Sequence, residues 1–434
     1  MILIRDVRLL ENNGNWDILV EGNRIKRIGR NLLEKESIDK RDVEIIDGKN
    51  MAAIPGLVNT HTHIPMTLFR GVADDIPLME WLNNYIWKME SKLNEELVYI
   101  GTLLGTVEMI KSGTTTFNDM YFHLDGIIKG VLESGIRAVL SYGMIDLFDE
   151  EKREKEIKNC EKIVKKIIKM GNPRIKPAIG PHAPYTCSKE LLTFSHEIAR
   201  EYNIPVHIHM NETLNEIKIV KEKTGMRPFE YLNSIEFFEG VKVIAAHCVH
   251  LSDREIDIIE KKSVVVSHNP ISNLKLGSGI APIPKLLEKN ILITLGTDGC
   301  GSNNNLNIFE EIKISSLIHK GVSLDPTSIP GEVSFKFATL NGGKALNLEV
   351  GVLKEGYLAD IVLVDLRKPY LIPVENLKSH LVYAFNGVVD TVLIDGNVVL
   401  RDGKMTNIDE YKVYEMAEKA YSKLVEDVDI KRDN

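Results

Sequence analysis

The sequence predicts an α/β protein in which a (β/α)8 barrel, the TIM barrel fold, is joined to a small β-sandwich formed from both chain ends. Through the central part of the 434-residue chain, short apolar runs alternate with helical patterns, as expected for βα units around a parallel sheet. At both ends, short strand-like segments are separated by turns instead. The chain is long enough for one large barrel and a smaller domain.

The central part contains eight candidate strands, the number that a closed barrel of this type needs. Helical patterns between them are plain at residues 95–111, 189–202 and 253–261. A longer insertion, residues 65–94, follows the first strand and carries Trp81, Tyr85 and Trp87. The strands are expected to end near His61, Asp119, Tyr142, His182, His209, His247, His268 and Asp298.

The two chain ends contain the remaining β structure. Strands are expected at residues 2–9, 16–21, 24–28 and 44–47, and again at 360–364, 388–394 and 398–401. Neither group is large enough to bury a core alone. We therefore expect one composite β-sandwich from residues 1–54 and 349–408, a barrel from residues 55–348, and a charged surface helix with a frayed end over residues 409–434.

Composition and charge exclude several classes of function. The net charge is −8 and no basic stripe is present, which argues against nucleic-acid and anionic-membrane binding. No apolar run reaches the length of a membrane span, and the N-terminus lacks a signal-peptide pattern. The four cysteines are scattered singly, which favours a reducing cytoplasm. Without a PCxxC element, any metal must be held by imidazoles and carboxylates.

The strongest local motif is the pair His61 and His63 at the end of the first barrel strand. Residues two apart on a strand point the same way, so both imidazoles can reach one metal ion. Buried histidine pairs also occur as purely structural features. The position at the carboxyl end of a barrel strand favours the metal, because active sites of this fold lie at that face.

Three other strand ends add polar side chains to the same face. His209 ends the fifth strand, His247 the sixth and Asp298 the eighth. His207 points the same way as His209 but lies deeper, so we interpret it as a core residue. An unpaired carboxylate such as Asp298 is costly to bury, which indicates a functional partner. Three imidazoles and a carboxylate suit zinc, and ligand type leaves iron or another divalent ion open.

Six motifs of the chain are PGLVNTHTH, GPHAPYTCS, HMNET, AAHCVHLS, VSHNPISNLKLGSGIAP and TLGTDGCGSNNNLN. Together they resemble the amidohydrolase-superfamily deaminases that act on S-adenosylhomocysteine and 5′-methylthioadenosine, and among these the chain is most similar to the archaeal 5′-deoxyadenosine deaminases. The resemblance covers essentially the whole chain.

The resemblance implies a role for each residue at the predicted site. His61, His63, His209 and Asp298 would hold one divalent metal ion. Glu212 would be the acid/base carboxylate, although as a residue beside a helix start it could also be structural. His247 would orient the attacking water. His182 and Glu90 would contact the substrate, with Glu90 reaching the ribose hydroxyls; from the sequence alone Glu90 would be a surface helix residue.

One position departs from the family pattern, and one expected ligand for a second metal is missing. Relatives that take S-adenosylhomocysteine can carry an arginine just after the third strand, where this chain has Tyr142, and Arg153 matches a second basic position only loosely. We therefore expect a preference for small or apolar 5′ groups. A second metal would need a bridging lysine at the end of the fourth strand, but Lys176 lies at its start.

The activity implied by the resemblance is hydrolytic deamination of adenosine-type nucleosides to the hypoxanthine nucleoside and ammonia. Deamination or dechlorination of another ring, such as guanine, cytosine or an s-triazine, is the alternative within enzymes. A non-catalytic assembly protein on the same scaffold is the alternative outside them, but such proteins typically lose metal ligands. We expect a nucleoside substrate and a homo-oligomer, either dimer or tetramer.

Overall fold

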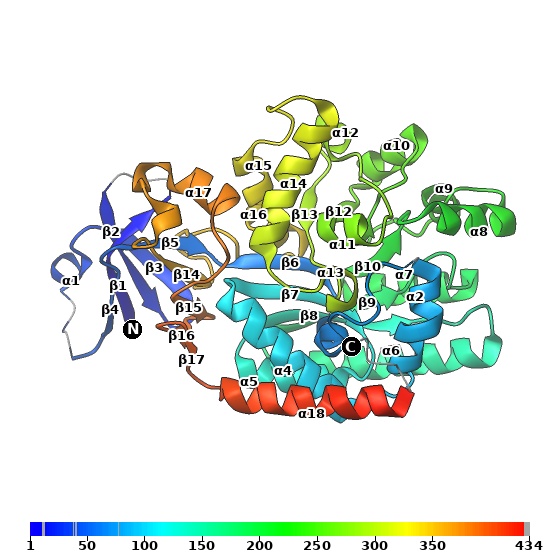
Figure 1. The fold of residues 1–434 in the computed structure, drawn as a ribbon, viewed down its shortest axis with the longest axis horizontal. Coiled ribbons are helices and arrows are strands. Elements are labelled where there is room, and N and C mark those ends of the chain that lie inside the picture. Colours follow the sequence, from blue (N-terminus) through cyan, green and yellow to red (C-terminus); the bar gives the residue numbers. More distant parts are fainter. Residues whose placement is uncertain (11–13, 38, 40, 77, 429–434) are drawn as a thin grey trace.

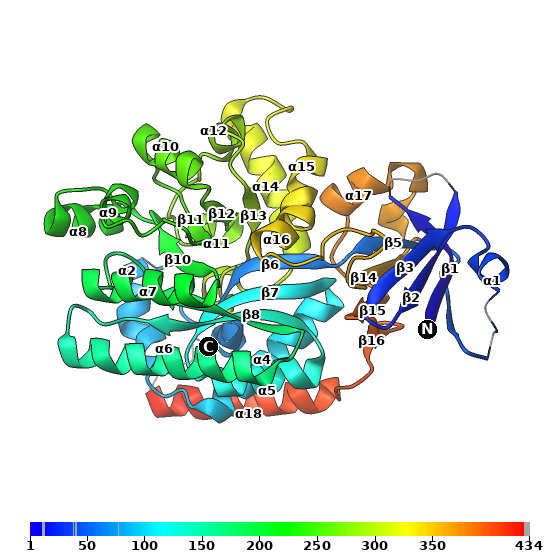
Figure 2. The same ribbon diagram turned by 180° about the vertical axis from the view of Figure 1, so that it is seen from behind.

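The fold is given by a computed structural model that describes residues 1–434 except 11–13, 38, 40, 77 and 429–434. The described residues form an eight-stranded parallel sheet and a nine-stranded mixed sheet. The parallel sheet lies in the larger, helix-covered part of the molecule, and the mixed sheet forms a separate layer at one end (Figures 1 and 2). The predicted fold class is confirmed.

The parallel sheet is a nearly closed barrel whose strands follow one another in chain order. The backbone N–H of Asp298 donates to the carbonyl of His61 at 3.0 Å, and the Thr60 hydroxyl donates to the Leu295 carbonyl at 2.9 Å. These bonds bring the first and last strands together beside the predicted metal ligands. The strands are β6 (Leu57–Thr62), β7 (Thr114–Tyr121), β8 (Arg137–Met144), β9 (Ile175–Pro181), β10 (Val206–Met210), β11 (Val243–His247), β12 (Val265–His268) and β13 (Ile293–Leu295).

Helices follow each barrel strand and cover its outer face (Figures 1 and 2). Polar residues begin several of them: Asp149, Ser188, Thr213 and Ser252 each accept a backbone N–H three residues further on. The three helices predicted from periodicity are present, with bounds that differ by one residue at most. The helices of the barrel are α4 (Glu95–Lys111), α5 (Leu124–Ser134), α6 (Glu150–Met170), α7 (Lys189–Tyr202), α8 (Leu214–Thr224), α9 (Pro228–Ser234), α10 (Asp253–Lys262), α11 (Pro270–Lys275), α12 (Ile283–Glu288), α13 (Cys300–Asn303), α14 (Ile308–Ser323), α15 (Gly331–Phe337) and α16 (Leu340–Ala345).

The insertion after β6 folds into short helical segments rather than one long helix. They are η1 (Ile64–Phe69), α2 (Leu78–Trp81), η2 (Leu82–Ile86) and α3 (Trp87–Glu90). The middle segment, η2, is a π-helix. A π turn inside a helix is rare and is found frequently at functional sites. This segment contributes to the wall of the cavity described below.

The mixed sheet combines strands from both chain ends, as predicted, in the order β17-β16-β15-β14-β5-β1-β2-β3, with β4 paired to β1. Seven of its strands were expected, and β5 and β17 were not. The segment Met51–Pro55 has no polar alternation because it is buried between two neighbours. The strands are β1 (Ile2–Leu9), β2 (Asn15–Glu21), β3 (Arg24–Gly29), β4 (Glu44–Asp47), β5 (Met51–Pro55), β14 (Ile361–Asp365), β15 (Thr391–Ile394), β16 (Asn397–Arg401) and β17 (Lys404–Met405); the helical segments beside them are α1 (Leu32–Lys35), η3 (Pro369–Leu371), η4 (Val374–Asn376) and α17 (Leu377–Tyr383).

A buried ion pair network joins this sheet to the barrel. Arg137, the first residue of β8, is only 1% exposed. Its Nε and Nη2 donate to the two oxygens of Asp360 at 3.1 and 3.0 Å, and Nη2 also donates to Asp395 at 3.1 Å. Arg137 is the central member, because removing it would leave the Asp360 carboxylate buried without its cation and Asp395 without its partner.

Replacing Arg137 with methionine is therefore expected to lower the free energy of unfolding by about 3–5 kcal/mol, as measured by urea denaturation. Arg27→Met is the matched control, because Arg27 pairs with Glu36 and Glu355 at a side chain that is 53% exposed. Such surface pairs contribute about 0–1 kcal/mol. Equal effects of the two substitutions would contradict the structural importance of the Arg137 network.

The C-terminal helix α18 (Glu410–Val428) lies along the outside of the barrel and packs against α4 (Figure 1). The helix carries many charged residues, but one of its faces is apolar: Val413, Ala417, Ala420 and Leu424 are buried at helical spacing. The last six predicted residues lie outside the described part. No helix among the described residues combines the length and apolarity that spanning a bilayer requires.

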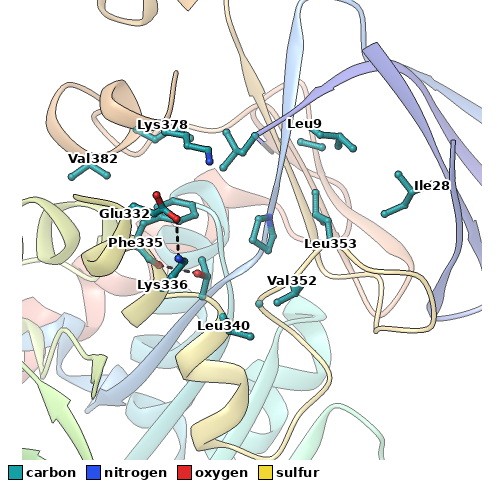
Figure 3. Close-up of a pocket in the computed structure, with 16 residues that line it drawn as sticks. Leu9, Ile28, Glu332, Phe335, Lys336, Leu340, Val352, Leu353, Lys378 and Val382 are labelled. Atoms are coloured by element: carbon teal, nitrogen blue, oxygen red, sulfur yellow. Dashed lines mark hydrogen bonds and ion pairs between the residues drawn. The ribbon is translucent and has the colours of Figure 1, made fainter. Parts of the chain in front are cut away.

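The small sheet and the barrel side meet around an apolar cavity (Figure 3). Leu9 and Ile28 line it from the sheet, and Phe335 and Val382 line it from α15 and α17. At its edge, the Lys336 ammonium contacts the Glu332 carboxylate at 2.8 Å. The catalytic face described next uses none of these residues.

Candidate active site

The predicted metal ligands lie together at the carboxyl ends of the barrel strands. His61 is on β6 and His63 follows it, His209 is on β10, His247 ends β11, and Asp298 follows β13. All five belong to one face because the strands are parallel, and this is the face where active sites of the fold occur. The structure thus brings together residues that are up to 237 positions apart because strand order closes the ring.

Their donor atoms converge on one point. The Nε2 atoms of His61 and His63 lie 3.2 and 3.3 Å from Oδ1 of Asp298. The Nε2 atoms of His63 and His209 are 3.2 Å apart. Ligand atoms of His61, His209 and His247 also lie within 4.8 Å of one another.

The hydrogen bonds of the imidazoles show that this centre suits a cation. Nδ1 of His63 donates to the Met120 carbonyl at 2.6 Å, and Nδ1 of His209 donates to the His182 carbonyl at 2.7 Å. When both imidazoles are neutral, each Nε2 atom carries a lone pair, so the lone pairs of His63 and His209 face each other. Nε2 of His61 is buried without a hydrogen-bond partner among the described residues. A divalent ion would satisfy all three nitrogens.

Burial keeps most of these imidazoles neutral, which is the form that binds metals. It lowers the pKa of His61 to about 4 and that of His209 well below the usual value. Burial alone would also lower the pKa of His63, but the hydrogen bond and charge of Asp298 outweigh it and raise that pKa to about 9. The negative charge of Asp298, which holds a proton on His63, would also attract a cation to this centre.

Two serines that the sequence analysis did not single out orient Asp298. The hydroxyls of Ser272 on α11 and Ser302 on α13 each donate to Oδ2 at 2.7 Å. Oδ1 is therefore left facing His61 and His63. Asp298 also has a positive φ of 63°, a conformation that costs energy outside glycine and is found at functional sites. Both serines lie inside the motifs that carried the resemblance, but no local pattern indicated their contacts.

His207 lies below the metal ligands, as predicted for a core residue, and is fully buried. Its Nε2 is 2.7 Å from Nδ1 of His61. A hydrogen bond on the far side of a ligand imidazole fixes the orientation and tautomer of its ring. His207 therefore also holds His61, a contact that strand spacing alone could not reveal.

His247 and Glu212 face each other beside this centre. Nδ1 of His247 donates to the Asn273 side-chain oxygen at 2.9 Å, and its Nε2 lies 3.8 Å from Oε2 of Glu212. Ser278 donates to the other Glu212 oxygen at 3.2 Å. Like Asp298, His247 has a positive φ, of 70°. The imidazole and the carboxylate are thus both fixed and both close to the ligand atoms.

A second carboxylate, Glu216, holds the turn that carries Glu212. Its oxygens accept the backbone N–H groups of Asn211 and Glu212 at 2.9 and 2.8 Å. Burial raises the pKa of Glu216 to about 8. The sequence analysis missed this residue, although its place in the first turn of α8, where a side chain can reach free backbone N–H groups, was a usable sign.

A cavity opens directly above these residues. His63, His182, His209, Glu212, His247 and Asp298 line it, together with Trp81, Trp87 and Glu90 from the insertion after β6. The Tyr121 hydroxyl donates to Glu90 at 3.0 Å. Nδ1 of His182 is 2.9 Å from the Thr186 hydroxyl, and burial lowers the pKa of His182 to about 3. Every residue predicted for the site therefore reaches this cavity or, for His61, the centre beneath it.

Tyr142 and Arg153 do not lie where the sequence analysis placed them. The Tyr142 hydroxyl accepts a hydrogen bond from Asn159 on α6 at 3.1 Å, so the ring points out of the barrel. Arg153 contacts Ser188 and Asp146 at 3.4 and 3.9 Å. At this end the cavity is lined by Phe122, Gly143 and Ile145, and its described lining contains neither lysine nor arginine.

Comparisons with known proteins agree with this arrangement. The amidohydrolase family model matches residues 52–399. The chain is 66% identical over 429 residues to a 5′-deoxyadenosine deaminase from Methanococcus aeolicus, covering 99% of this chain and 100% of that protein. It is 68% identical over 421 residues to the one from Methanocaldococcus jannaschii, covering 97% and 99%.

Two solved structures extend the comparison. An adenosine deaminase from Xanthomonas campestris with bound zinc superposes with a TM-score of 0.90 at 30% identity and covers 98% of both chains. An atrazine chlorohydrolase from Arthrobacter aurescens superposes with a TM-score of 0.89 at 22% identity, covering 97% of this chain and 100% of that one. At that identity the second likeness concerns the fold alone.

Proposed function

The chain belongs to the amidohydrolase family, and from this premise we propose that it removes the C6 amino group of adenosine-type nucleosides by hydrolysis. Membership confirms the resemblance predicted from the sequence. The products would be the hypoxanthine nucleoside and ammonia. The observation that carries the proposal is the cluster of imidazoles and carboxylates beneath a cavity whose far wall carries Glu90. The candidate substrates are 5′-deoxyadenosine, 5′-methylthioadenosine, S-adenosylhomocysteine and adenosine.

We propose that His61, His63, His209 and Asp298 hold one divalent ion. Zinc is the first candidate, because the donor set suits it and the related adenosine deaminase contains it; iron or another divalent metal would satisfy the same ligands. When bound, such an ion lowers the pKa of a water molecule towards about 7 and so makes a nucleophile available near neutral pH.

The protein's own residues would supply the proton transfers. Glu212 would donate a proton to the ring nitrogen beside C6, which makes C6 electrophilic, and would then help to move a proton to the departing amino group. His247 and Asp298 would orient the attacking water, since both are fixed by hydrogen bonds on their other side. Water thus adds to C6, one of its protons replaces the proton that Glu212 gave to the ring nitrogen, and the other reaches the amino group; the C6–N bond then breaks, ammonia leaves and a C6 carbonyl forms.

The substrate would extend from this centre along the cavity. Glu90 would accept hydrogen bonds from the ribose hydroxyls, and His182 would contact the purine. The 5′ group would then meet the apolar wall of Phe122, Gly143 and Ile145. A carboxylate at that end would find no cation among the described lining residues.

The proposal predicts an order of substrates. 5′-Deoxyadenosine and 5′-methylthioadenosine should match or exceed S-adenosylhomocysteine in kcat/KM, and free adenine should be a very poor substrate because each charge-assisted bond to Glu90 is worth about 1.5–3 kcal/mol. The ultraviolet change from adenine to hypoxanthine measures each rate directly. A tenfold preference for S-adenosylhomocysteine would contradict the apolar 5′ site, and faster turnover of guanine or an s-triazine would favour the alternative ring chemistry.

We further propose a homo-oligomer, either dimer or tetramer, and a cytoplasmic location. The first rests on the family resemblance, and the second rests on the scattered single cysteines. Light scattering of the purified protein at two concentrations tests the first, and a single monomeric mass at both would contradict it.

A further inference from the structure

We propose that Tyr121 is a positioning residue that holds the Glu90 carboxylate for the ribose and thereby sets the affinity for nucleosides. This inference rests on the proposed function, because it requires Glu90 to bind ribose hydroxyls. Tyr121 is the last residue of β7, on the barrel itself, whereas Glu90 ends α3 in the insertion. The tyrosine therefore ties the inserted helical segment that carries Glu90 to a strand of the barrel.

The contact between the two side chains is well defined. The Tyr121 hydroxyl donates to Oε1 of Glu90 at 3.0 Å. Tyr121 is only 3% exposed, so its ring has little freedom to turn away. Among the described residues, Tyr121 is the side chain that bonds the Glu90 carboxylate. Both residues line the cavity.

The chemistry of a carboxylate explains why this one bond matters. An ionised carboxylate can accept about four hydrogen bonds and can therefore take both vicinal hydroxyls of a ribose. The tyrosine occupies one position on Oε1 and leaves the other positions for substrate. Burial raises the pKa of Glu90 and outweighs the Tyr121 hydrogen bond and the charge of His63, which both lower it, so that the pKa is about 7. Tyr121 thus favours the anionic form that can accept from both hydroxyls.

The neighbouring strand offers a matched control. Tyr121 and Tyr142 are paired in register on β7 and β8. Tyr142, however, points out of the barrel to Asn159. Substituting either tyrosine with phenylalanine removes one hydroxyl at the same height of the barrel, but only Tyr121 contacts Glu90.

The test compares Tyr121→Phe, Tyr142→Phe and the wild-type enzyme with 5′-deoxyadenosine and with a 2′,3′-dideoxy analogue that lacks both ribose hydroxyls. For Tyr121→Phe, we expect KM for 5′-deoxyadenosine to rise about 5- to 20-fold, less than the roughly 12- to 160-fold that loss of a hydrogen bond to a charged group can cost, because the Glu90 carboxylate itself remains, while kcat changes less than twofold. The dideoxy analogue should be affected less than twofold, and Tyr142→Phe should leave both constants unchanged.

A second comparison tests whether Tyr121 acts through the Glu90 carboxylate. In a Glu90→Gln background, Tyr121→Phe should cause little further loss, because the tyrosine acts through the carboxylate. An unchanged KM in Tyr121→Phe, a fall confined to kcat, or an equal loss with the dideoxy analogue would overturn the inference.

Calorimetric binding of 5′-deoxyinosine, the expected product, separates this inference from the proposed function. It reports ribose recognition without turnover. Suppose that the wild-type protein deaminates 5′-deoxyadenosine and that Tyr121→Phe binds the product as tightly as the wild type does. This outcome would contradict the role of Tyr121 but not the proposed function. A wild-type protein that neither binds nor deaminates nucleosides would overturn both proposals.

Discussion

Glu212→Gln is expected to keep its metal and its substrate affinity but to lose roughly 10²- to 10⁴-fold in kcat, the usual contribution of a general acid/base. Glutamine has the same size and can still accept the Ser278 hydrogen bond through its side-chain oxygen. It cannot carry a proton from the ring nitrogen to the departing amine. Steady-state kinetics with 5′-deoxyadenosine and metal analysis of the same preparation measure the two quantities.

The control for this substitution is Glu222→Gln on α8, the helix that follows Glu212. The Glu222 side chain is 65% exposed and faces Lys218 on the surface, so its kcat should equal that of the wild type. A Glu212→Gln enzyme with normal turnover would exclude the acid/base role. A loss of metal instead would assign Glu212 to the metal centre.

Asp298→Ala is expected to give folded protein that binds less than about a tenth of the wild-type metal and has no measurable deaminase activity. Among the described residues, Asp298 is the carboxylate in direct contact with the His61 and His63 nitrogens, and the substitution removes it. A divalent site that loses one of its four proposed ligands, the carboxylate, loses a negative charge and one position of its coordination geometry. Metal content by mass spectrometry and folding by circular dichroism check the two parts of the expectation.

His61→Ala should behave in the same way, whereas Asp257→Ala, at a side chain that is 51% exposed, should retain metal and activity. Near-stoichiometric metal with normal turnover in Asp298→Ala would contradict the ligand assignment. It would also reopen the case for a non-catalytic scaffold protein.

The sequence predicted the barrel and the residues at its mouth because both depend on local patterns. Apolar runs at strand length, each ending in a polar side chain, are sufficient to place His61, His209, His247 and Asp298 at one face. The same patterns could not predict β5, because a strand that is buried on both faces shows no polar alternation.

The side chains that hold the site were less predictable. Ser272, Ser302 and Glu216 act through contacts between elements far apart in the chain or around a turn, which no single motif encodes. Tyr142 was misplaced because alternation tells which residues share a face of a strand but does not tell which face is the inner one.

Glu90 shows the converse limitation. Its local pattern predicts an exposed helix, and only the family resemblance placed it near the substrate. The structure explains the difference, because the insertion folds over the cavity and turns this part of α3 towards Tyr121.

The pairing of β5 with β14 has a consequence for the synthesis of the chain. Pro55 and Ile361 are register partners, so about 300 residues are translated after β5 before its neighbour exists. At roughly 5–20 residues per second, this interval lasts about 15–60 s. During that time the nascent N-terminal strands have one open, largely apolar edge, the kind of edge that pairs readily with other chains. The barrel strands lie between β5 and β14 in the chain and are therefore synthesised before β14. The terminal sheet is completed only after them.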